Sequence, residues 1–251
     1  FTDVALEYGG TQVTTKVLTT PASPELGVLS GITKALGESG LTASDVDILI
    51  HGTTLATNAL IERKGAKVAL ITTEGLRDSV EMAQENRFDQ YDINIDRPTP
   101  LVPRYLRWGV RERLNVHGQA LIPLAEDSVT TLIPDIDKFE IAAVAIGLIH
   151  SYANSMHEER VAEILSKARP ELSITLSSEV CPEIREYERQ STASANAYVQ
   201  PMMSRYLREL DSRLTSLGFN CPFLLMTSGG GLTTLDTAIK FPVRLVESGP
   251  A

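Results

Sequence analysis

The sequence predicts an α/β protein built around a mixed sheet, and three features of the 251-residue chain support this. Apolar stretches of strand length alternate with amphipathic stretches of helix length. The glycine pair Gly9-Gly10 joins two stretches rich in β-branched residues, which is typical of an antiparallel hairpin. The order strand, helix, strand then occurs twice, within residues 45–73 and 141–178, and indicates parallel pairing through right-handed crossovers.

The first elements follow from turn and cap signals. The hairpin should cover residues 1–19, and a helix should follow with Ser23 as its N-cap and Pro24 at its first position. We expect this helix to end at Gly37 and Gly40 and to bury a stripe made of Leu26, Leu29, Ile32 and Leu36.

The first strand, helix, strand unit comes next. "DVDILI" (45–50) reads as a short buried strand, residues 55–64 as a helix that ends at Gly65, and "KVALITT" (67–73) as a second buried strand. We expect the two strands to pair in parallel.

The middle of the chain is less regular until the second such unit. Residues 76–84 look helical, and residues 85–105 read as a long loop because they contain three prolines and no period. Residues 104–114 alternate like a strand, and the stretch to about 138 has room for one short helix. The second unit then consists of a core strand (141–149), a helix (155–168) and a strand (172–178).

The last part changes character and suggests a domain boundary. From Pro182 to Leu217 the pattern is helical, with an interruption or kink near Pro201, and "PFLLMTSGGGL" (222–232) is a buried strand that runs into three glycines. We therefore expect two domains, residues 1–177 and 178–251.

Composition excludes some classes of partner. The net charge of −9, without a basic cluster, argues against nucleic acid, and the longest apolar runs are too short to span a membrane. Two cysteines, Cys181 and Cys221, give neither a disulfide framework nor a zinc site, and the four histidines lack metal-ligand spacing. The sequence therefore predicts a cytoplasmic protein without a metal site of its own.

Both ends of the sequence are strand-like. The chain enters a strand pattern at Phe1 and closes on a strand that runs into a glycine turn, whereas natural termini usually carry polar tails. We expect the sequence to be a fragment of a longer protein.

The stretch "HGTT", residues 51–54, lies where a strand meets a helix, which is where parallel sheets collect ligands. Gly52 permits a tight turn, and Thr53 or Thr54 can cap the next helix, whose free N–H groups attract an anion. His51 can then act as a donor or as a general acid or base. In the alternative, Thr53 is only a cap and His51 is a satisfied buried residue.

Two glycine turns and a charged helix are weaker candidates. Ser228 and the glycines after it can form a backbone cradle for phosphate or simply a flexible turn, and "ESGPA" (247–251) is a second turn of this kind. The pairs Arg185 with Glu188 and Glu186 with Arg189 fit a solvated helix face. No P-loop, dinucleotide-binding or nucleophile-elbow motif occurs.

Eight stretches in order resemble the hydantoinase A and 5-oxoprolinase family, which includes N-methylhydantoinases and acetone carboxylase beta subunits. They are "FTDVALEY", "KVLTTP", "IHGTTLATNALIERKGAKVALITTEGLRD", "ENRFDQYD", "LIHSYANSMHEERVAEIL", "SSEVCPEIREYERQSTASANAYVQP", "TSGGGL" and "ESGPA". The resemblance covers essentially the whole chain. It implies the N-terminal part of such a protein, with the fold of the actin, sugar kinase and heat-shock ATPase superfamily.

The resemblance also implies chemistry and roles. Family members use ATP and Mg²⁺ to phosphorylate a carbonyl or enol oxygen, a reaction that depends mostly on positioning and charge stabilisation. It assigns catalysis to His51, Thr53 and Thr54 and substrate binding to Asn58 and Arg87. The nucleotide would contact Thr2, Asp3, Ser228, Gly229, Gly230, Gly231 and Gly249.

Several expectations about activity follow from this resemblance. The parent protein would open hydantoin-like or 5-oxoproline-like lactams, with a hydantoinase B-like subunit or domain as partner. The alternatives are the ATP-hydrolysing subunit of an acetone-type or acetophenone-type ketone carboxylase, and a non-catalytic domain that binds a partner. The aspartates expected to hold the metal lie outside this chain, so we expect the 251 residues alone to be inactive.

Overall fold

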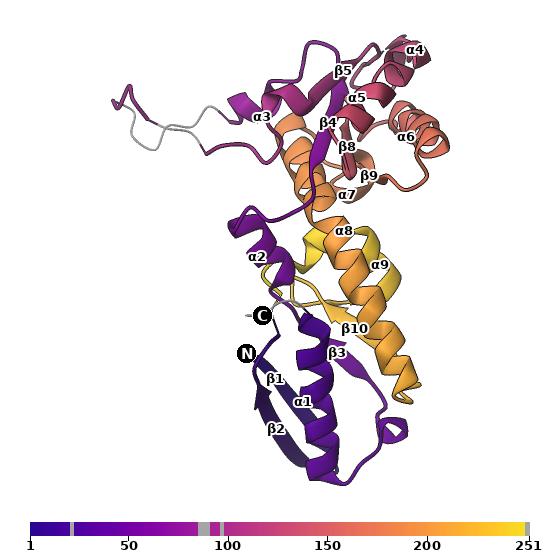
Figure 1. The fold of residues 1–251 in the computed structure, drawn as a ribbon. Coiled ribbons are helices and arrows are strands. Elements are labelled where there is room, and N and C mark those ends of the chain that lie inside the picture. The colour runs from indigo at the N-terminus through magenta and orange to yellow at the C-terminus, as the bar shows by residue number, and fades with distance from the viewer. Residues whose placement is uncertain (21–22, 85–90, 96–97, 249–251) are drawn as a thin grey trace. The chain divides into compact units, whose positions relative to one another are not determined.

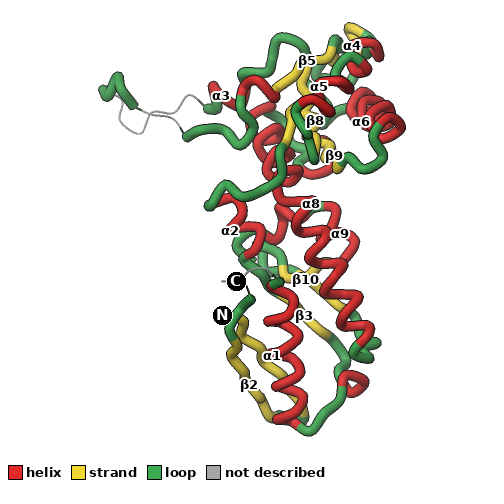
Figure 2. Tube along the Cα trace, viewed as in Figure 1, coloured by secondary structure: helices red, strands yellow, loops and turns green. Residues whose placement is uncertain are grey.

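The computed structural model describes residues 1–20, 23–84, 91–95 and 98–248. The chain folds as two compact units, and the elements labelled in Figure 1 are divided between them. The first unit comprises the described parts of Phe1–Thr54, Met202–Lys240 and Arg244–Ala251, and the second comprises those of Leu55–Pro201 and Phe241–Val243. Each unit mixes helices and strands (Figure 2), as the predicted fold class requires.

The first unit begins with the predicted hairpin. Strand β1 (Thr2–Tyr8) pairs antiparallel with β2 (Thr11–Val17), and Tyr8 lies opposite Thr11 across the glycine turn. Helix α1 (Pro24–Ser39) packs against both strands, and the 3₁₀ turn η1 (Ala43–Asp45) follows it.

The buried face of α1 differs from the predicted leucine stripe. Leu26 is exposed and Leu29 and Leu36 are only half-buried, whereas the face on the hairpin consists of Gly27, Val28, Gly31, Ile32 and Ala35. The reason is close packing, because a Cβ at Gly31 would lie 2.7 Å from Val4 Cγ2. Ser23 occupies the N-cap position, but its side chain makes no capping hydrogen bond.

A three-stranded sheet completes the first unit. Strand β3 (Leu49–His51) is parallel to β10 (Phe223–Met226), which pairs antiparallel with β11 (Leu232–Thr234). Helix α9 (Leu235–Lys240) packs on β10 and β11, and the 3₁₀ turn η3 (Pro242–Leu245) follows. The prediction of a buried strand at 45–50 was wrong, because the strand is shorter and Ile50 is 47% exposed.

The second unit is organised by a parallel sheet with strand order β5-β4-β8-β9. Strands β4 (Val68–Thr73) and β8 (Ala143–Gly147) are buried throughout, as expected of apolar strands covered on both faces. The outer strands are β5 (Arg107–Val110) and β9 (Ser173–Leu176). The predicted pairing of residues 45–50 with 67–73 was wrong, because β5 and β8 occupy both edges of β4.

Shorter elements surround this sheet. The predicted helix at 155–168 is confirmed as α6 (Met156–Ala168), and it leads from β8 to β9. The strand expected at 104–114 is divided into η2 (Arg104–Leu106), β5 and β6 (Arg113–Leu114), and β6 pairs with the unpredicted β7 (Ala120–Ile122). The remaining helices are α2 (Leu55–Ile61), α3 (Ser79–Met82), α4 (Glu126–Thr130), α5 (Ile133–Lys138) and α7 (Ser177–Val180).

The long helix α8 (Glu186–Ser216) belongs to both units. It contains Pro201 without an interruption, so of the interruption or kink predicted there the interruption was wrong, and the kink stays a prediction. Instead, the division between the two units falls immediately after Pro201. These units are assembled from separate segments, and the sequence domains 1–177 and 178–251 stay a prediction.

Candidate functional site

Two predicted ligand-binding turns leave the same edge of the sheet in the first unit. Strands β3 and β10 are parallel neighbours, and Leu225 lies opposite His51. Residues 52–54 follow β3 and residues 227–231 follow β10, so both turns start at adjacent carboxyl ends. In α/β sheets this is the edge at which ligands bind.

The turn after β10 exposes its main chain. The Thr227 amide donates to the Gly231 carbonyl oxygen at 2.8 Å, and the Gly230 amide donates to the Thr227 carbonyl oxygen at 2.9 Å. Gly230 has a φ of 78°, which an L side chain rarely adopts. A Cβ on Gly229 or Gly230 would meet no atom within 4 Å, so a ligand oxygen could approach the backbone closely here.

A third segment of the first unit joins the two turns. The Ser228 amide donates to the Arg244 carbonyl oxygen at 2.9 Å, and the Ser228 hydroxyl donates to the same oxygen at 3.2 Å. Four residues further, the buried Ser248 hydroxyl donates to the Thr53 carbonyl oxygen at 3.2 Å. The structure therefore brings together the "HGTT" turn, the glycine turn and the segment that leads into "ESGPA".

His51 occupies an apolar position beside this edge. Its Nε2 lies 2.9 Å from the Tyr206 hydroxyl, and its ring centroid lies 6.2 Å from that of Phe223. Burial lowers the pKa of His51 from 6.5 to about 4, so the imidazole is neutral near pH 7. It is therefore suited to donate or accept a hydrogen bond rather than to act as a cation.

Tyr206 is a residue that sequence reasoning missed. It lies on α8, 155 positions from its partner, and its helical spacing resembles that of any core residue. Burial raises the pKa of Tyr206, the charge of Glu25 raises it further, and a hydrogen bond with the Thr53 side chain lowers it. The phenol therefore keeps its proton at physiological pH, and only the fold reveals its contact with the "HGTT" turn.

The other predicted contacts are placed less centrally. The Thr2 hydroxyl lies 2.9 Å from that of Thr19, and the exposed Asp3 carboxylate lies 3.1 Å from Lys16 Nζ. Within the described residues, neither Thr2 nor Asp3 forms a hydrogen bond or an ion pair with residues 51–54 or 227–231. Asn58 lies in α2 of the second unit, and Arg87 and Gly249 lie outside the described residues.

The chemistry of this edge suits phosphate better than a metal. Main-chain amides and hydroxyls of the glycine turn are groups that bind anionic oxygens. The described residues contain no group of three or more His, Cys, Asp or Glu side chains that could hold a metal ion. These residues therefore fit the phosphates of ATP, but do not by themselves fit Mg²⁺.

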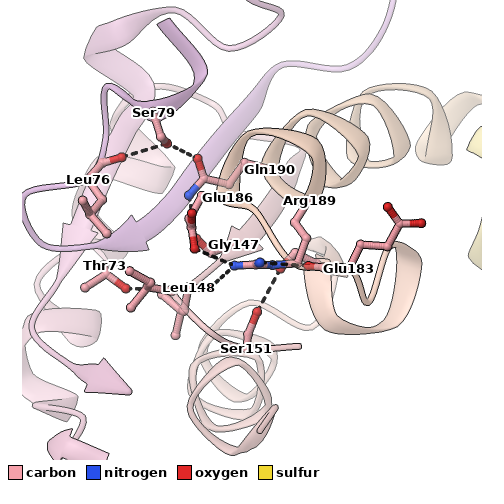
Figure 3. Close-up of polar contacts among 12 residues, drawn as sticks. Thr73, Leu76, Ser79, Gly147, Leu148, Ser151, Glu183, Glu186, Arg189 and Gln190 are labelled. Atoms are coloured by element: carbon pink, nitrogen blue, oxygen red, sulfur yellow. Dashed lines mark hydrogen bonds and ion pairs between the residues drawn. The ribbon is translucent and has the colours of Figure 1, made fainter. Parts of the chain in front are cut away.

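A separate polar cluster stabilises the second unit, and Figure 3 shows its residues. Gln190 Nε2 donates to Thr72 Oγ1 and to the Gly147 carbonyl oxygen, both at 2.9 Å, while the Ser79 hydroxyl donates to Gln190 Oε1. These bonds fix the start of α8 between the carboxyl ends of β4 and β8.

Arg189 corrects the expectation of a solvated helix face. Its side chain is fully buried, and it donates to the carbonyl oxygens of Leu148 at 2.8 Å and Glu183 at 3.0 Å (Figure 3). Its guanidinium also lies 5.4 Å from the centre of the Tyr152 ring. The i, i+3 spacing to Glu186 could not distinguish this buried role from a surface ion pair.

Two buried carboxylates complete the polar structure of the second unit. Glu112 Oε2 lies 2.8 Å from His157 Nδ1, and its other oxygen accepts a hydrogen bond from Thr73. Glu158 accepts from the Leu148 amide at 2.9 Å and from the Ser177 hydroxyl at 2.7 Å. The contacts of His157 are those of a structural residue.

The helices of the described segments do not include a membrane span. In that part of the chain, no helix is both long enough and apolar enough to cross a bilayer.

Comparison with sequence families gives two matches in succession. The hydantoinase/oxoprolinase N-terminal region matches residues 1–169, and the hydantoinase/oxoprolinase description matches residues 189–251. Caprolactamase subunit alpha of Pseudomonas jessenii is 34% identical, over 100% of this chain and 37% of that protein. The 5-oxoprolinase of Dictyostelium discoideum is 28% identical, over 87% of this chain and 19% of that protein.

Solved structures share the fold. The crystal structure of ATP-dependent caprolactamase from Pseudomonas jessenii superposes with a TM-score of 0.90 at 34% identity, over 99% of this chain and 37% of that chain. The nucleotide-free structure of acetone carboxylase gives a TM-score of 0.89 at 26% identity, again over 99% and 37%. The chain thus spans little more than a third of the length of each of these two solved chains.

Proposed function

The chain belongs to the hydantoinase/oxoprolinase family, and from this we propose that the complete protein opens a cyclic amide at the expense of ATP. The first unit would bind the phosphates, and the substrate class would be lactams related to hydantoin, 5-oxoproline or caprolactam. Relatives named caprolactamase and 5-oxoprolinase support this substrate class.

One observation carries the proposal, namely the parallel register of β3 and β10. It sets the "HGTT" turn and the glycine turn at adjacent strand ends, where main-chain amides can face one anionic ligand. Had these turns left opposite ends of the sheet, they could not serve a common phosphate group.

The residues of this edge have separate tasks in the proposed reaction. ATP would transfer its terminal phosphoryl group to the amide carbonyl oxygen and leave as ADP, which makes the amide carbon more electrophilic. Water would then add to this carbon, the ring C–N bond would break with the amine as leaving group, and the resulting acyl phosphate would be hydrolysed to carboxylate and phosphate. The amides of Thr227, Ser228 and Gly230 fix the shape of the glycine turn, whereas those of Gly229 and Gly231 have no hydrogen bond within the described residues. These two amides would hold and orient the phosphates, which is the main requirement of phosphoryl transfer. Neutral His51, with Thr53 and Thr54 beside it, provides hydrogen bonds at the reacting oxygen without adding charge.

Other parts of the proposal concern groups beyond these residues. The proposal also places the aspartates that hold Mg²⁺ outside this chain, and the part of the chain that the structure describes contains no group of three or more His, Cys, Asp or Glu side chains that could hold a metal ion. A second subunit or domain would complete the enzyme, in keeping with relatives named as subunits. Substrate binding by Asn58 and Arg87 and a cytoplasmic location also stay predictions.

A ketone carboxylase is the second candidate, and a specific similarity favours it. The acetone carboxylase beta subunit of Xanthobacter autotrophicus is 26% identical over 98% of this chain. The same phosphate-binding edge would serve there to activate an enol oxygen in place of an amide oxygen. The fold therefore allows both reactions.

Substrate-dependent consumption of ATP by the complete protein, with its partner subunit if one copurifies, tests the proposal. We expect caprolactam, 5-oxoproline or N-methylhydantoin to stimulate ADP formation in step with ring opening, and acetone with bicarbonate to have no effect. Stimulation of ADP formation by acetone with bicarbonate, and by none of the three cyclic amides, would establish the carboxylase alternative. If ATP neither stabilised the complete protein against heat nor was consumed with any substrate, a non-catalytic binding role would replace both.

A further inference from the structure

We propose that Tyr206 is a positioning residue that holds His51 in the tautomer with its proton on Nδ1, so that Nδ1–H is the imidazole's only donor. The inference deepens the proposed function, on which the role of His51 in catalysis rests. It concerns a contact between β3 and the part of α8 that belongs to the first unit, and no sequence motif predicts this contact.

The hydrogen bonds of the Tyr206 oxygen determine the direction of its proton. His51 Nε2 lies 2.9 Å from this oxygen, and the Thr53 side chain forms a second hydrogen bond with it. A phenol hydroxyl is a stronger donor than an imidazole N–H or an aliphatic hydroxyl, and the unprotonated nitrogen of a neutral imidazole is a stronger acceptor than a hydroxyl oxygen. Because a phenol has a single proton, Tyr206 then donates that proton to Nε2, and a neutral imidazole must carry its own on Nδ1.

The surroundings keep both side chains neutral. Burial beside Phe223 of β10 lowers the pKa of His51 to about 4, and burial together with Glu25 of α1 raises the pKa of Tyr206. Glu25 is itself buried in the first turn of α1. Neither proton is therefore lost to solvent near pH 7, and the arrangement has one stable direction.

The core of the first unit makes this contact rigid. Tyr206 is only 7% exposed, and its neighbours Met203, Leu207 and Leu210 on α8 are fully buried. The rings of His51 and Tyr206 are tilted by 44° with centroids 5.9 Å apart. Tyr206 thus has little freedom to turn its hydroxyl away from the histidine.

Kinetics of the complete protein separate positioning from structure. We expect Tyr206→Phe to lower kcat by about tenfold to a hundredfold while KM for ATP stays unchanged, because only orientation is lost. Tyr198→Phe is the matched control, since Tyr198 is a buried tyrosine on the same helix but in the second unit. A loss of kcat in both variants, or in neither, would overturn the inference.

Two replacements of the histidine distinguish its nitrogens. In His51→Asn the side-chain amide lies near the position of Nδ1, whereas in His51→Gln it lies near that of Nε2. We expect the asparagine variant to keep more activity, and Tyr206→Phe to have no further effect in that background. Higher activity of the glutamine variant would identify Nε2 as the working donor and refute the proposal.

NMR of ¹⁵N-histidine-labelled protein provides a readout that does not require turnover. The His51 signal, assigned by its absence in His51→Asn, should show a protonated Nδ1 in the wild type and a mixture of tautomers in Tyr206→Phe. If Tyr206→Phe fails to fold, Thr53→Val removes the donor to Tyr206 and should give the same mixture. A protein without lactam-dependent ATP consumption but with this tautomer would contradict the proposed function alone, and a wild-type Nε2 tautomer would contradict this inference alone.

Discussion

The hydroxyl of Ser248 donates to the carbonyl oxygen of Thr53 at 3.2 Å, although 195 positions separate the two residues. Ser248 is almost completely buried and Thr53 is half-buried, so this bond is partly shielded from water. It fixes the "HGTT" turn from a segment that also meets the glycine turn through Arg244 and Ser228. The shape of the candidate site therefore depends on residues from both ends of the chain.

Removing this hydroxyl should loosen the turn. We expect Ser248→Ala to lower the free energy of unfolding by about 1 kcal/mol, because the half-buried Thr53 carbonyl loses a donor. Under the proposed function, KM for ATP should also rise. Ser216→Ala is the control. The Ser216 hydroxyl donates to the Ser212 carbonyl oxygen at the exposed end of α8, so its removal should change neither the free energy of unfolding nor KM. Equal thermal stability of Ser248→Ala and wild type would show that the bond is not important.

The low pKa of His51 should make stability depend on pH. An unfolded histidine with a pKa of 6.5 binds a proton more readily than the folded one with a pKa of about 4. Its contribution, about 3 kcal/mol, is therefore complete above pH 6.5, falls as the pH drops from 6.5 to about 4 and is absent below that.

Urea unfolding across this pH range measures the effect. The midpoint of the wild type should fall relative to that of His51→Asn as the solution is acidified. Parallel midpoints for the two proteins across the window would mean that His51 titrates normally and is not buried as described.

The glycine turn offers a pair of variants that separate strain from ligand access. Gly230→Ala should lower the free energy of unfolding by about 1–2 kcal/mol, because its φ of 78° suits glycine. Gly229→Ala should leave stability unchanged, since its φ is ordinary and its Cβ would meet no atom. It should instead raise KM for ATP if phosphate approaches the backbone there, and a normal KM would argue against that approach.

Arg189 and Arg213 lie on the same helix, one buried and one exposed, so replacing each shows how much burial increases an arginine's contribution to stability. Arg189→Met should destabilise the protein by about 2–4 kcal/mol, because the buried Leu148 carbonyl oxygen and the partly buried bond to Glu183 both lose their donor. Arg213→Met removes an exposed ion pair with Glu209 and should cost no more than about 0.5 kcal/mol. Chemical denaturation of both variants measures the difference, and similar losses would show that Arg189 is not the organising residue of its cluster.

Local patterns were sufficient for some elements and not for others. The hairpin, the buried strands β4 and β8 and the helix α6 follow from turn residues and periodicity within each segment. The partner of β3 could not be predicted in this way, because β10 lies far along the chain and the nearest apolar strand, β4, already has two partners.

The candidate site shows the same limit. Glycines and hydroxyl residues after strands indicated residues 51–54 and 228–231, and the parallel register confirmed that they share an edge. Tyr206 was missed and Arg189 was assigned to a solvated face, because helical spacing gives the same pattern for a core residue, a polar network and a surface ion pair. Only tertiary packing, which buries both side chains, distinguishes these cases.

The discontinuity of the first unit has a consequence for biosynthesis. Almost all of the second unit is one uninterrupted stretch that ends at Pro201, whereas the sheet of the first unit requires β3 to wait for β10. Domains generally fold as they emerge during translation, at about 5–20 residues per second. The second unit should therefore acquire its structure on the ribosome first. Residues 49–51 of β3 would remain accessible to chaperones and proteases until their partner strand β10 has been synthesised.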